Sequence, residues 1–312
     1  MENYHRAVIP YHRLSPEACS ALAVAIDDAI KLFDRWGIPI LGASRLPLAA
    51  RHLRQVAESG TYGATPPELE ITAKAIMLAI DFYCIASSLE QDREDVIANE
   101  LAVALKGDLE RRSRDRSAYE MQSQFWVGAL LAQSGLHPAM PVILNRRRPD
   151  FVIRVDTLDC GVEVKRPQTE NSSERALHDA AAQLREYGKP GIVVIDLSEC
   201  LGTDSMIINE REPTTREVIN QQTSLLADRL TNIAHTYERS NKFDRIIALF
   251  IYTRFIASRS DKDAELDIGI SFRVTLFPRA CGGLVIPQQR QIEQRLIRGL
   301  ERLGNRVQYE YR

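Results

Sequence analysis

The chain has 312 residues, enough for one large domain or two ordinary ones. Its 45% hydrophobic and 26% charged residues are average for a globular protein, and 40 Lys and Arg against 42 Asp and Glu leave a formal charge of -2. This balance excludes a strongly basic, histone-like binder but not a local basic groove. There is no run of 18 apolar residues, no secretory-type start and no CxxC pair among the five cysteines. We therefore expect a soluble, reduced, cytoplasmic protein without a membrane span, a disulfide framework or a zinc site.

Helical periodicity dominates the first third of the chain. Ser15 and Pro16 suit the start of one helix, as an N-cap and a first helical residue, and Gly60 suits the end of the next. No strand is expected before residue 140. The pattern predicts an all-helical N-terminal region over residues 1–112, which could regulate the rest of the chain or dock a partner. Its four helices are predicted at about 15–33, 46–59, 66–83 and 92–105.

Strands and helices alternate after the arginine-rich stretch 111–116. This alternation predicts an α/β or α+β domain over residues 113–312. The continuous apolar run at 192–195 is typical of a strand buried on both faces. Helices are predicted at about 117–134, 173–187, 214–239 and 288–303, and strands at 142–144, 151–155, 162–164, 192–195, 246–252 and 270–277.

One hairpin carries most of the ionisable groups of interest. Its turn is expected around residues 157–161, where Asp and Gly are at home. Asp150 precedes the first strand, and Glu163 and Lys165 project from one face of the second, because alternate residues share a face. The two carboxylates and the carbonyl of Val164 are hard oxygen ligands that suit Mg²⁺ or Mn²⁺. Lys165 could position a water made acidic by the metal, or stabilise charge on a phosphate.

These residues resemble the motif of the PD-(D/E)xK, or restriction-endonuclease-like, nuclease superfamily. Pro149 and Asp150 are followed, after 12 residues, by Glu163-Val164-Lys165. The superfamily's acidic residue on the preceding helix is matched by Glu120. The Gln-x-x-x-Tyr motif of its RecB-like members is matched by Gln183 and Tyr187.

The resemblance implies a restriction-endonuclease-like mixed sheet flanked by helices, and metal-dependent hydrolysis of phosphodiester bonds. Asp150, Glu163 and Glu120 would hold the metal, while Gln183 and Tyr187 would order the site. DNA is the implied substrate, with RNA open, and an endonuclease is favoured over an exonuclease. The resemblance also suggests an effector of anti-phage defence or DNA repair, acting beside a helicase or ATPase, since the chain has no Walker motif of its own.

Arginines border the predicted site. Arg146, Arg147, Arg148 and Arg166 could contact phosphates. A short charge run is, however, equally typical of a solvated surface.

Three alternatives stay open at this point. The hairpin could carry an exposed ion pair of Glu163 and Lys165 on an edge strand, with Asp150 as a turn residue. The chain could be a catalytically inactive, nuclease-fold subunit that binds nucleic acid or acts as a scaffold. It could also combine a helical interaction module with an unrelated α/β domain. Cys160, expected in the hairpin turn, has no histidine partner in the sequence pattern and is not expected to be a nucleophile.

Overall fold

The computed structural model describes most of the chain as one α/β assembly built on a mixed sheet. The strands are β1 (Ala7–Leu14), β2 (Phe151–Val155), β3 (Leu158–Lys165), β4 (Gly191–Asp196), β5 (Ile207–Asn209), β6 (Ile246–Ser258) and β7 (Leu266–Leu276). The helices are α1 (Cys19–Arg35), α2 (Arg45–Ser59), α3 (Pro66–Ser88), α4 (Asp95–Ala104), α5 (Ser117–Gln133), α6 (Glu170–Tyr187), α7 (Pro213–Glu238) and α8 (Ile286–Glu310), with the short 3₁₀ turn η1 (Thr203–Ser205). The described residues are 7–88, 95–107, 109, 117–139, 148–156, 158–205, 207–209, 213–238, 243–258, 266–277 and 286–310.

The sheet has a parallel centre and antiparallel edges. Its order is β1-β7-β6-β4-β3-β2, and β5 pairs with the far end of β6. β3, β4 and β6 are parallel neighbours, whereas β2 and β3 form an antiparallel hairpin, as do β6 and β7. All six residues of β4 are buried, because this strand lies in the middle of the sheet with helices on both faces. The predicted strand at 192–195 is therefore confirmed.

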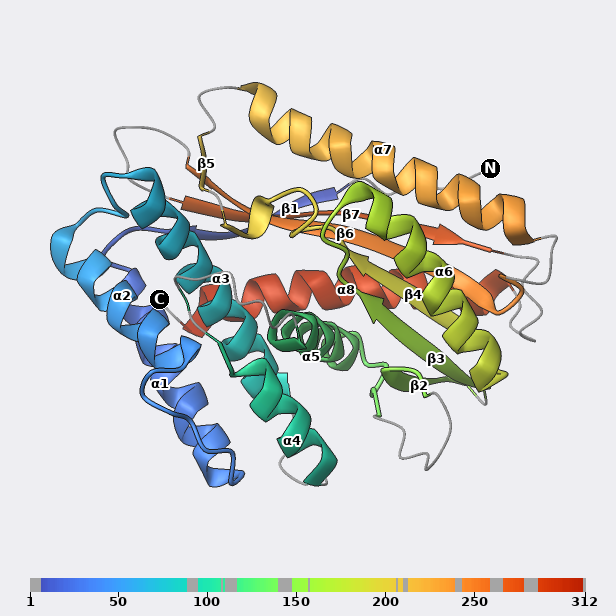
Figure 1. Cartoon of the computed structure of the whole chain (residues 1–312), viewed down its shortest axis with the longest axis horizontal. Coiled ribbons are helices and arrows are strands. Elements are labelled where there is room, and N and C mark those ends of the chain that lie inside the picture. Colours follow the sequence, from blue (N-terminus) through green and yellow to red (C-terminus); the bar gives the residue numbers. More distant parts are fainter. Residues whose placement is uncertain are drawn as a thin grey trace.

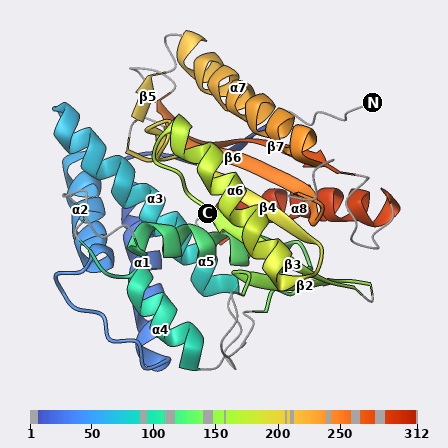
Figure 2. The same ribbon diagram turned by 45° about the vertical axis from the view of Figure 1, so that its right-hand side comes forward.

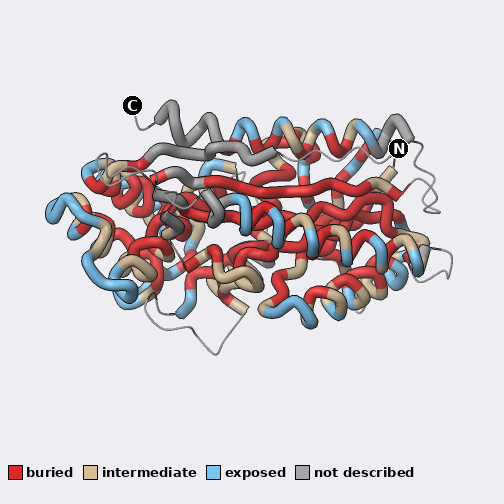
Figure 3. Tube along the Cα trace, turned by 90° about the horizontal axis from the view of Figure 1, so that it is seen from above, coloured by how far each residue is buried: buried red, intermediate tan, exposed pale blue. Residues whose placement is uncertain are grey.

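Helices cover both faces of the sheet (Figures 1 and 2). Phe151 on β2 faces Gly128 of α5. Phe151 pairs with Val162, so Gly161, the preceding residue of β3, is directed to the other face of the sheet, where it lies against Leu184 of α6. The two helices thus lie on opposite sides of the hairpin. α7 lies beside α6, and α8 lies beside α5 and β1. Figure 3 shows buried residues concentrated along the strands and the inner faces of these helices.

The helices α1–α4 gather at one end of the sheet (Figures 1 and 2), where α3 packs on α5. The four predicted N-terminal helices are confirmed, and α2 ends at Gly60, which has the left-handed φ of 66° that glycine adopts easily. The expectation of no strand before residue 140 is wrong. β1 precedes α1 and pairs antiparallel with β7, at the opposite end of the chain. The sheet therefore uses residues from both sides of the predicted boundary at 112.

The hairpin turn is tighter than predicted. Val155 pairs with Leu158, so only two residues form the turn, and Asp156 there has the left-handed φ of 56°. Cys160 and Gly161 lie within β3, not in the turn, and Cys160 is buried. Burial raises the pKa of the Cys160 thiol to about 12, which makes it a poor nucleophile.

Two further predictions concern a strand at 142–144 and a membrane span. The predicted strand at 142–144 lies outside the described residues. Among the helices of the described part of the chain, none combines the length and the apolar character needed to cross a membrane.

Candidate active site

Asp150 is held at the start of the hairpin by the backbone of the second strand. β2 begins at Phe151, opposite Val162, so Val164 extends beyond the last paired residue of β2. The Val164 N–H donates instead to Oδ2 of Asp150 at 2.7 Å. In a strand the N–H and C=O of one residue point toward the same neighbour, so the Val164 carbonyl faces the same edge. Asp150 and this carbonyl, both predicted as metal ligands, therefore share one edge of the sheet.

Glu163 is the most deeply buried of the predicted residues. Its exposed fraction is 0%, although its side chain ends in a carboxylate. Lys165 donates to Oε2 at 2.9 Å, whereas Oε1 is buried and has no hydrogen-bond partner among the described residues. β3 lies between β2 and β4, so an exposed ion pair on an edge strand is excluded. A buried carboxylate oxygen without a partner is unfavourable unless a donor or a cation reaches it.

Both carboxyl groups of the site have raised pKa values. Burial, and next the charge of Asp150, raise the pKa of Glu163 to about 8, against the opposing effect of Lys165. Burial also raises the pKa of Asp150, and Lys165 and the Val164 N–H act against it. The site thus has two carboxylates and one ammonium, which leaves it short of positive charge.

A cavity of about 240 Å³ opens beside Lys165, between α5, α6 and the end of β3. Glu120, which is exposed, lines it together with Gln124 and Lys165. Neither Asp150 nor Glu163 lines the cavity, whereas Lys165, which donates to Glu163, does. Among the described residues, no group of three or more His, Cys, Asp or Glu side chains is arranged to hold a metal ion. Glu120 is therefore not brought together with Asp150 and Glu163 as a three-carboxylate set.

Gln124 is a site residue that the sequence reasoning missed. It lies one helical turn after Glu120 on α5, and its Nε2 donates to Oδ1 of Asp150 at 3.0 Å. With the Val164 N–H on Oδ2, this bond fixes the orientation of both Asp150 oxygens. The i, i+4 spacing from Glu120 was a usable signal, because residues four apart share a helix face.

Gln183 and Tyr187 belong to α6, and among the described residues neither side chain forms a hydrogen bond with Asp150 or Glu163. Tyr187 packs over Gly161, and a larger side chain at position 161 would meet both Tyr187 and Leu184. The Tyr187 ring lies 5.8 Å from the Lys189 ammonium. Burial raises the pKa of Tyr187, and the charged groups that act on it belong to the start of β3 and to Lys189. Half-buried Gln183 makes no hydrogen bond within the described part of the chain. Their predicted role in ordering the site stays a prediction.

The predicted phosphate-binding arginines have separate environments. Arg146 and Arg147 lie outside the described residues. Arg148 is half-buried and forms a 2.6 Å ion pair with Glu100 of α4. Arg166 lines the cavity beside Lys165, but its side chain is 3% exposed and lies among carboxylates. The reason is strand alternation, which turns Arg166 away from the face that carries Lys165.

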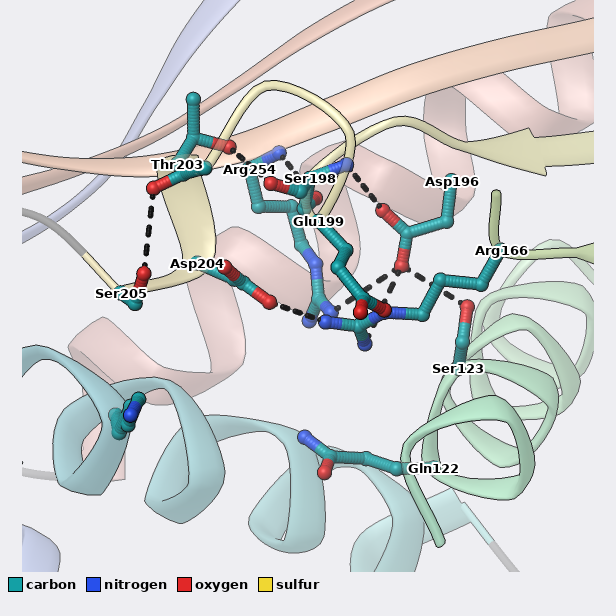
Figure 4. A network of polar contacts seen from close by, with 12 residues as sticks. Gln122, Ser123, Arg166, Asp196, Ser198, Glu199, Thr203, Asp204, Ser205 and Arg254 are labelled. Carbon is teal, nitrogen blue, oxygen red and sulfur yellow. Dashed lines mark hydrogen bonds and ion pairs between the residues drawn. The ribbon is translucent and has the colours of Figure 1, made fainter. Parts of the chain in front are cut away.

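Arg166 belongs to a buried polar network at the carboxyl ends of β3 and β4 (Figure 4). Asp196, fully buried, accepts hydrogen bonds from Ser123 and from the Ser198 N–H, both at 3.0 Å. Arg166 and Arg254 approach the same Asp196 oxygen at 3.8 Å each. Although burial alone would raise it, the two guanidinium groups hold the pKa of Asp196 below its ordinary value. Asp196 is thus compensated by two cations and two hydrogen-bond donors.

Each arginine of this network has a further carboxylate partner. Arg166 also pairs with Asp204 and, at 3.5 Å, with Glu199. Arg254 also pairs with Asp81, whose pKa is nevertheless raised by burial. Both guanidinium groups remain charged, because their carboxylate neighbours raise their pKa against the effect of burial.

The residues around Glu163 fit a divalent cation. The unpartnered Oε1, Asp150 and the Val164 carbonyl are oxygen ligands of the type that Mg²⁺ and Mn²⁺ prefer. The Lys165 ammonium, bonded to Oε2, now serves as the counter-ion of Glu163, so a cation at Oε1 would compete with it for the same carboxylate. Comparison of the chain with protein-family models, with curated proteins and with solved structures gave no match.

Proposed function

We propose that this chain is a metal-dependent nuclease that hydrolyses phosphodiester bonds, with DNA as the expected substrate. The observation that carries the proposal is the buried carboxylate of Glu163, which has an unpartnered oxygen beside Asp150 and a single ammonium partner, Lys165. A site short of positive charge is suited to a cation, and this one lies on the motif that resembles the PD-(D/E)xK superfamily.

The residues divide the chemistry between them. Asp150, Glu163 and the Val164 carbonyl would hold Mg²⁺ or Mn²⁺, which when bound supplies an acidic water and neutralises charge on the phosphate. Gln124 and the Val164 N–H keep Asp150 oriented. Lys165, released from Glu163 by the cation, would face the adjacent cavity, where it can orient the attacking water or stabilise the transition state.

The wider role follows from the resemblance. We place the chain among effector subunits of anti-phage defence or DNA repair that act beside a helicase or ATPase. The formal charge of -2 supports recruitment by a partner, because it gives little general attraction to nucleic acid.

A second candidate is a nuclease-fold subunit that binds nucleic acid without cleaving it. It is favoured by the burial of Glu163 beneath Lys165 and by the lack of a three-carboxylate group among the described residues. The two candidates differ in whether a divalent cation produces any chemistry.

The test is cleavage of plasmid and single-stranded DNA with Mg²⁺ or Mn²⁺ by the wild type, Glu163→Gln and Lys165→Met. Lys189→Met is the matched control, since Lys189 pairs with Asp159 at the other end of β3, far from the carboxylates. We expect cleavage by the wild type and the control only. Equal cleavage by all four proteins would reveal a contaminant and overturn the site. Metal-independent DNA binding by all four, without cleavage, would favour the second candidate.

A further inference from the structure

A second cavity, of about 420 Å³, lies between the N-terminal helices and the carboxyl ends of the central strands. Its volume falls within the range of about 300–1,000 Å³ that is usual for small-ligand pockets. One wall comes from α2, α3 and α5, and the other from the segments that follow β3 and β4. Figure 4 shows Gln122 of α5 across from Arg166 and Asp204. The carboxyl ends of parallel strands are a common place for ligands in α/β folds.

Arg45, at the start of α2, carries the main argument. Its exposed fraction is 1%, and it lines this cavity. Its guanidinium donates to neutral acceptors: Oε1 of Gln122 at 2.9 Å and the carbonyls of Ala104 and Ala118. Its Nε is buried and has no hydrogen-bond partner within the part of the chain that the structure describes. Burial lowers the pKa of Arg45, as expected for a cation that lacks a paired carboxylate.

The neighbouring arginines make the contrast clear. Arg166 and Arg254 line the same cavity, and both are paired with buried carboxylates. Arg45 makes no ion pair with the described residues; the Tyr119 ring, 4.5 Å from the guanidinium carbon, and the charge of Asp81 act on it without pairing with it. An anion in the cavity would supply a directly paired counter-charge.

Lys74 adds a second cation to the helical wall. Its side chain is 12% exposed and pairs at 2.7 Å with Glu70, which lies one turn earlier on α3 and is 42% exposed. Because Glu70 is so exposed, this ion pair is weak and its lysine can turn to a better anion. Arg45 and Lys74 thus place two cations on one wall of the cavity.

The rest of the cavity combines an apolar patch with the charged groups of the buried network. Met77, Leu78 and Leu109 provide apolar surface. Glu199 and Asp204, on the opposite wall, are partly exposed carboxylates that can accept hydrogen bonds from hydroxyl or amino groups. A matching ligand is anionic at one end, apolar in its middle and hydrogen-bond-donating at the other end.

We propose that this cavity binds a nucleoside monophosphate. The phosphate would lie against Arg45 and Lys74, the base against the apolar surface, and the donor groups of the sugar or base against Glu199 and Asp204. This proposal stands apart from the proposed nuclease function, because the cavity contains neither Asp150 nor Glu163.

Calorimetric titration of the full chain with four ribonucleoside monophosphates, their nucleosides and inorganic phosphate tests the proposal. We expect at least one monophosphate to bind at least about tenfold more tightly than its nucleoside and than inorganic phosphate, because both halves of the cavity contribute. Binding of inorganic phosphate as tightly as every nucleotide would overturn the proposal, as would no saturable binding of any nucleotide in the millimolar range.

Two variants test the role of the Lys74 cation, one at Lys74 and one at its exposed partner Glu70. Arg45 also ties α2 to α4 and α5, so its replacement could unfold the protein, whereas Lys74 lies on a helix surface. Lys74→Met should weaken binding of the monophosphate about tenfold and leave nucleoside binding unchanged. Glu70→Gln, the matched control, breaks the same ion pair but keeps the cation, so binding should be equal or tighter. Equal weakening by both variants would overturn the proposal.

Discussion

Lys165, the last residue of β3, and the next residue, Arg166, serve two polar sites of opposite character. Lys165 faces Glu163 and Asp150, a site with more carboxylates than cations and an unpartnered oxygen. Arg166, which points the other way, joins a network in which Asp196 is held by two arginines and two hydrogen bonds. Both sites are buried, yet the carboxyl pKa rises at Glu163 and falls at Asp196. The number of cations and donors that face each carboxylate, not burial, distinguishes the proposed cation site at Glu163 from the structural role of Asp196.

Removing the charge of Asp196, which Arg166 and Arg254 share, should have the largest effect on stability. Asp196→Asn leaves the facing guanidinium groups of Arg166 and Arg254 without their shared counter-charge, so we expect it to lower the free energy of unfolding by about 3–5 kcal/mol. Urea unfolding measures this change. Asp159→Asn is the control, because Asp159 pairs with exposed Arg154 and Lys189 and should change stability by less than about 1 kcal/mol. Equal stabilities of the two variants would contradict the view of Asp196 as a brace.

Removing the ammonium of the other site should affect chemistry more than stability. We expect Lys165→Met to lower the rate of DNA cleavage by about 10²–10³-fold, the scale on which preorganised charge acts on a transition state. The affinity for Mg²⁺ should not fall, because the ammonium competes with the cation for Glu163. Single-turnover rates at several Mg²⁺ concentrations separate the two quantities. Loss of Mg²⁺ affinity with an unchanged rate at saturation would show that Lys165 assists binding, not catalysis.

The stability of the fold should fall as the pH rises from the ordinary pKa of Glu163 to its raised pKa in the folded state. The pKa of this group rises from 4.5 to about 8 on folding, so between these values the folded state holds more protons than the unfolded state. The free energy of unfolding therefore decreases as pH rises through this window, by an amount on the order of a few kcal/mol. Urea unfolding across the window measures the slope. Glu163→Gln should flatten it and be more stable than the wild type above about pH 8. An unchanged slope in this variant would assign the effect to other groups.

The smallest effect is expected at Gln124. Gln124→Leu removes one hydrogen bond from Asp150, a loss of about 1 kcal/mol, and should raise the Mg²⁺ concentration for half-maximal cleavage several-fold. Gln183→Leu provides the matched control, since Gln183 makes no hydrogen bond within the described residues and should leave this concentration unchanged. A comparable change in Gln183→Leu would instead support the role that the Gln-x-x-x-Tyr resemblance assigns to it.

Local pattern was enough to place the elements that form the hairpin. The first strand was expected at 151–155, as found, and the helix that follows β3 begins within a few residues of its expected start. Asp150, Glu163 and Lys165 come together because they belong to this one hairpin, where strand alternation and the antiparallel pairing fix their positions. Strand alternation also predicts that Arg166 faces the opposite side of the sheet from Lys165, but it does not predict which residues Arg166 meets there.

β1 could not be identified in this way. Its sequence contains Pro10, which has no N–H to donate, followed by the polar His12 and Arg13. Its pairing with β7 shifts register between Pro10 and His12, the kind of irregular edge position where proline is tolerated. The segment is a strand because β7, more than 250 residues later, offers it a free edge. Nothing near it in the sequence carries that information.

The sequence by itself therefore determined the helices, most strands and the carboxylate–lysine hairpin, since these depend on periodicity and on contacts between near neighbours. Tertiary structure alone decided that Gln124 orients Asp150 from 26 residues away and that Arg254 meets Asp81 from 173 residues away. It also decided that Arg45 is buried against neutral acceptors beside a cavity. The reason is physical: the charge state of a buried group depends on every neighbour that has replaced water, and folding draws those neighbours from distant parts of the chain.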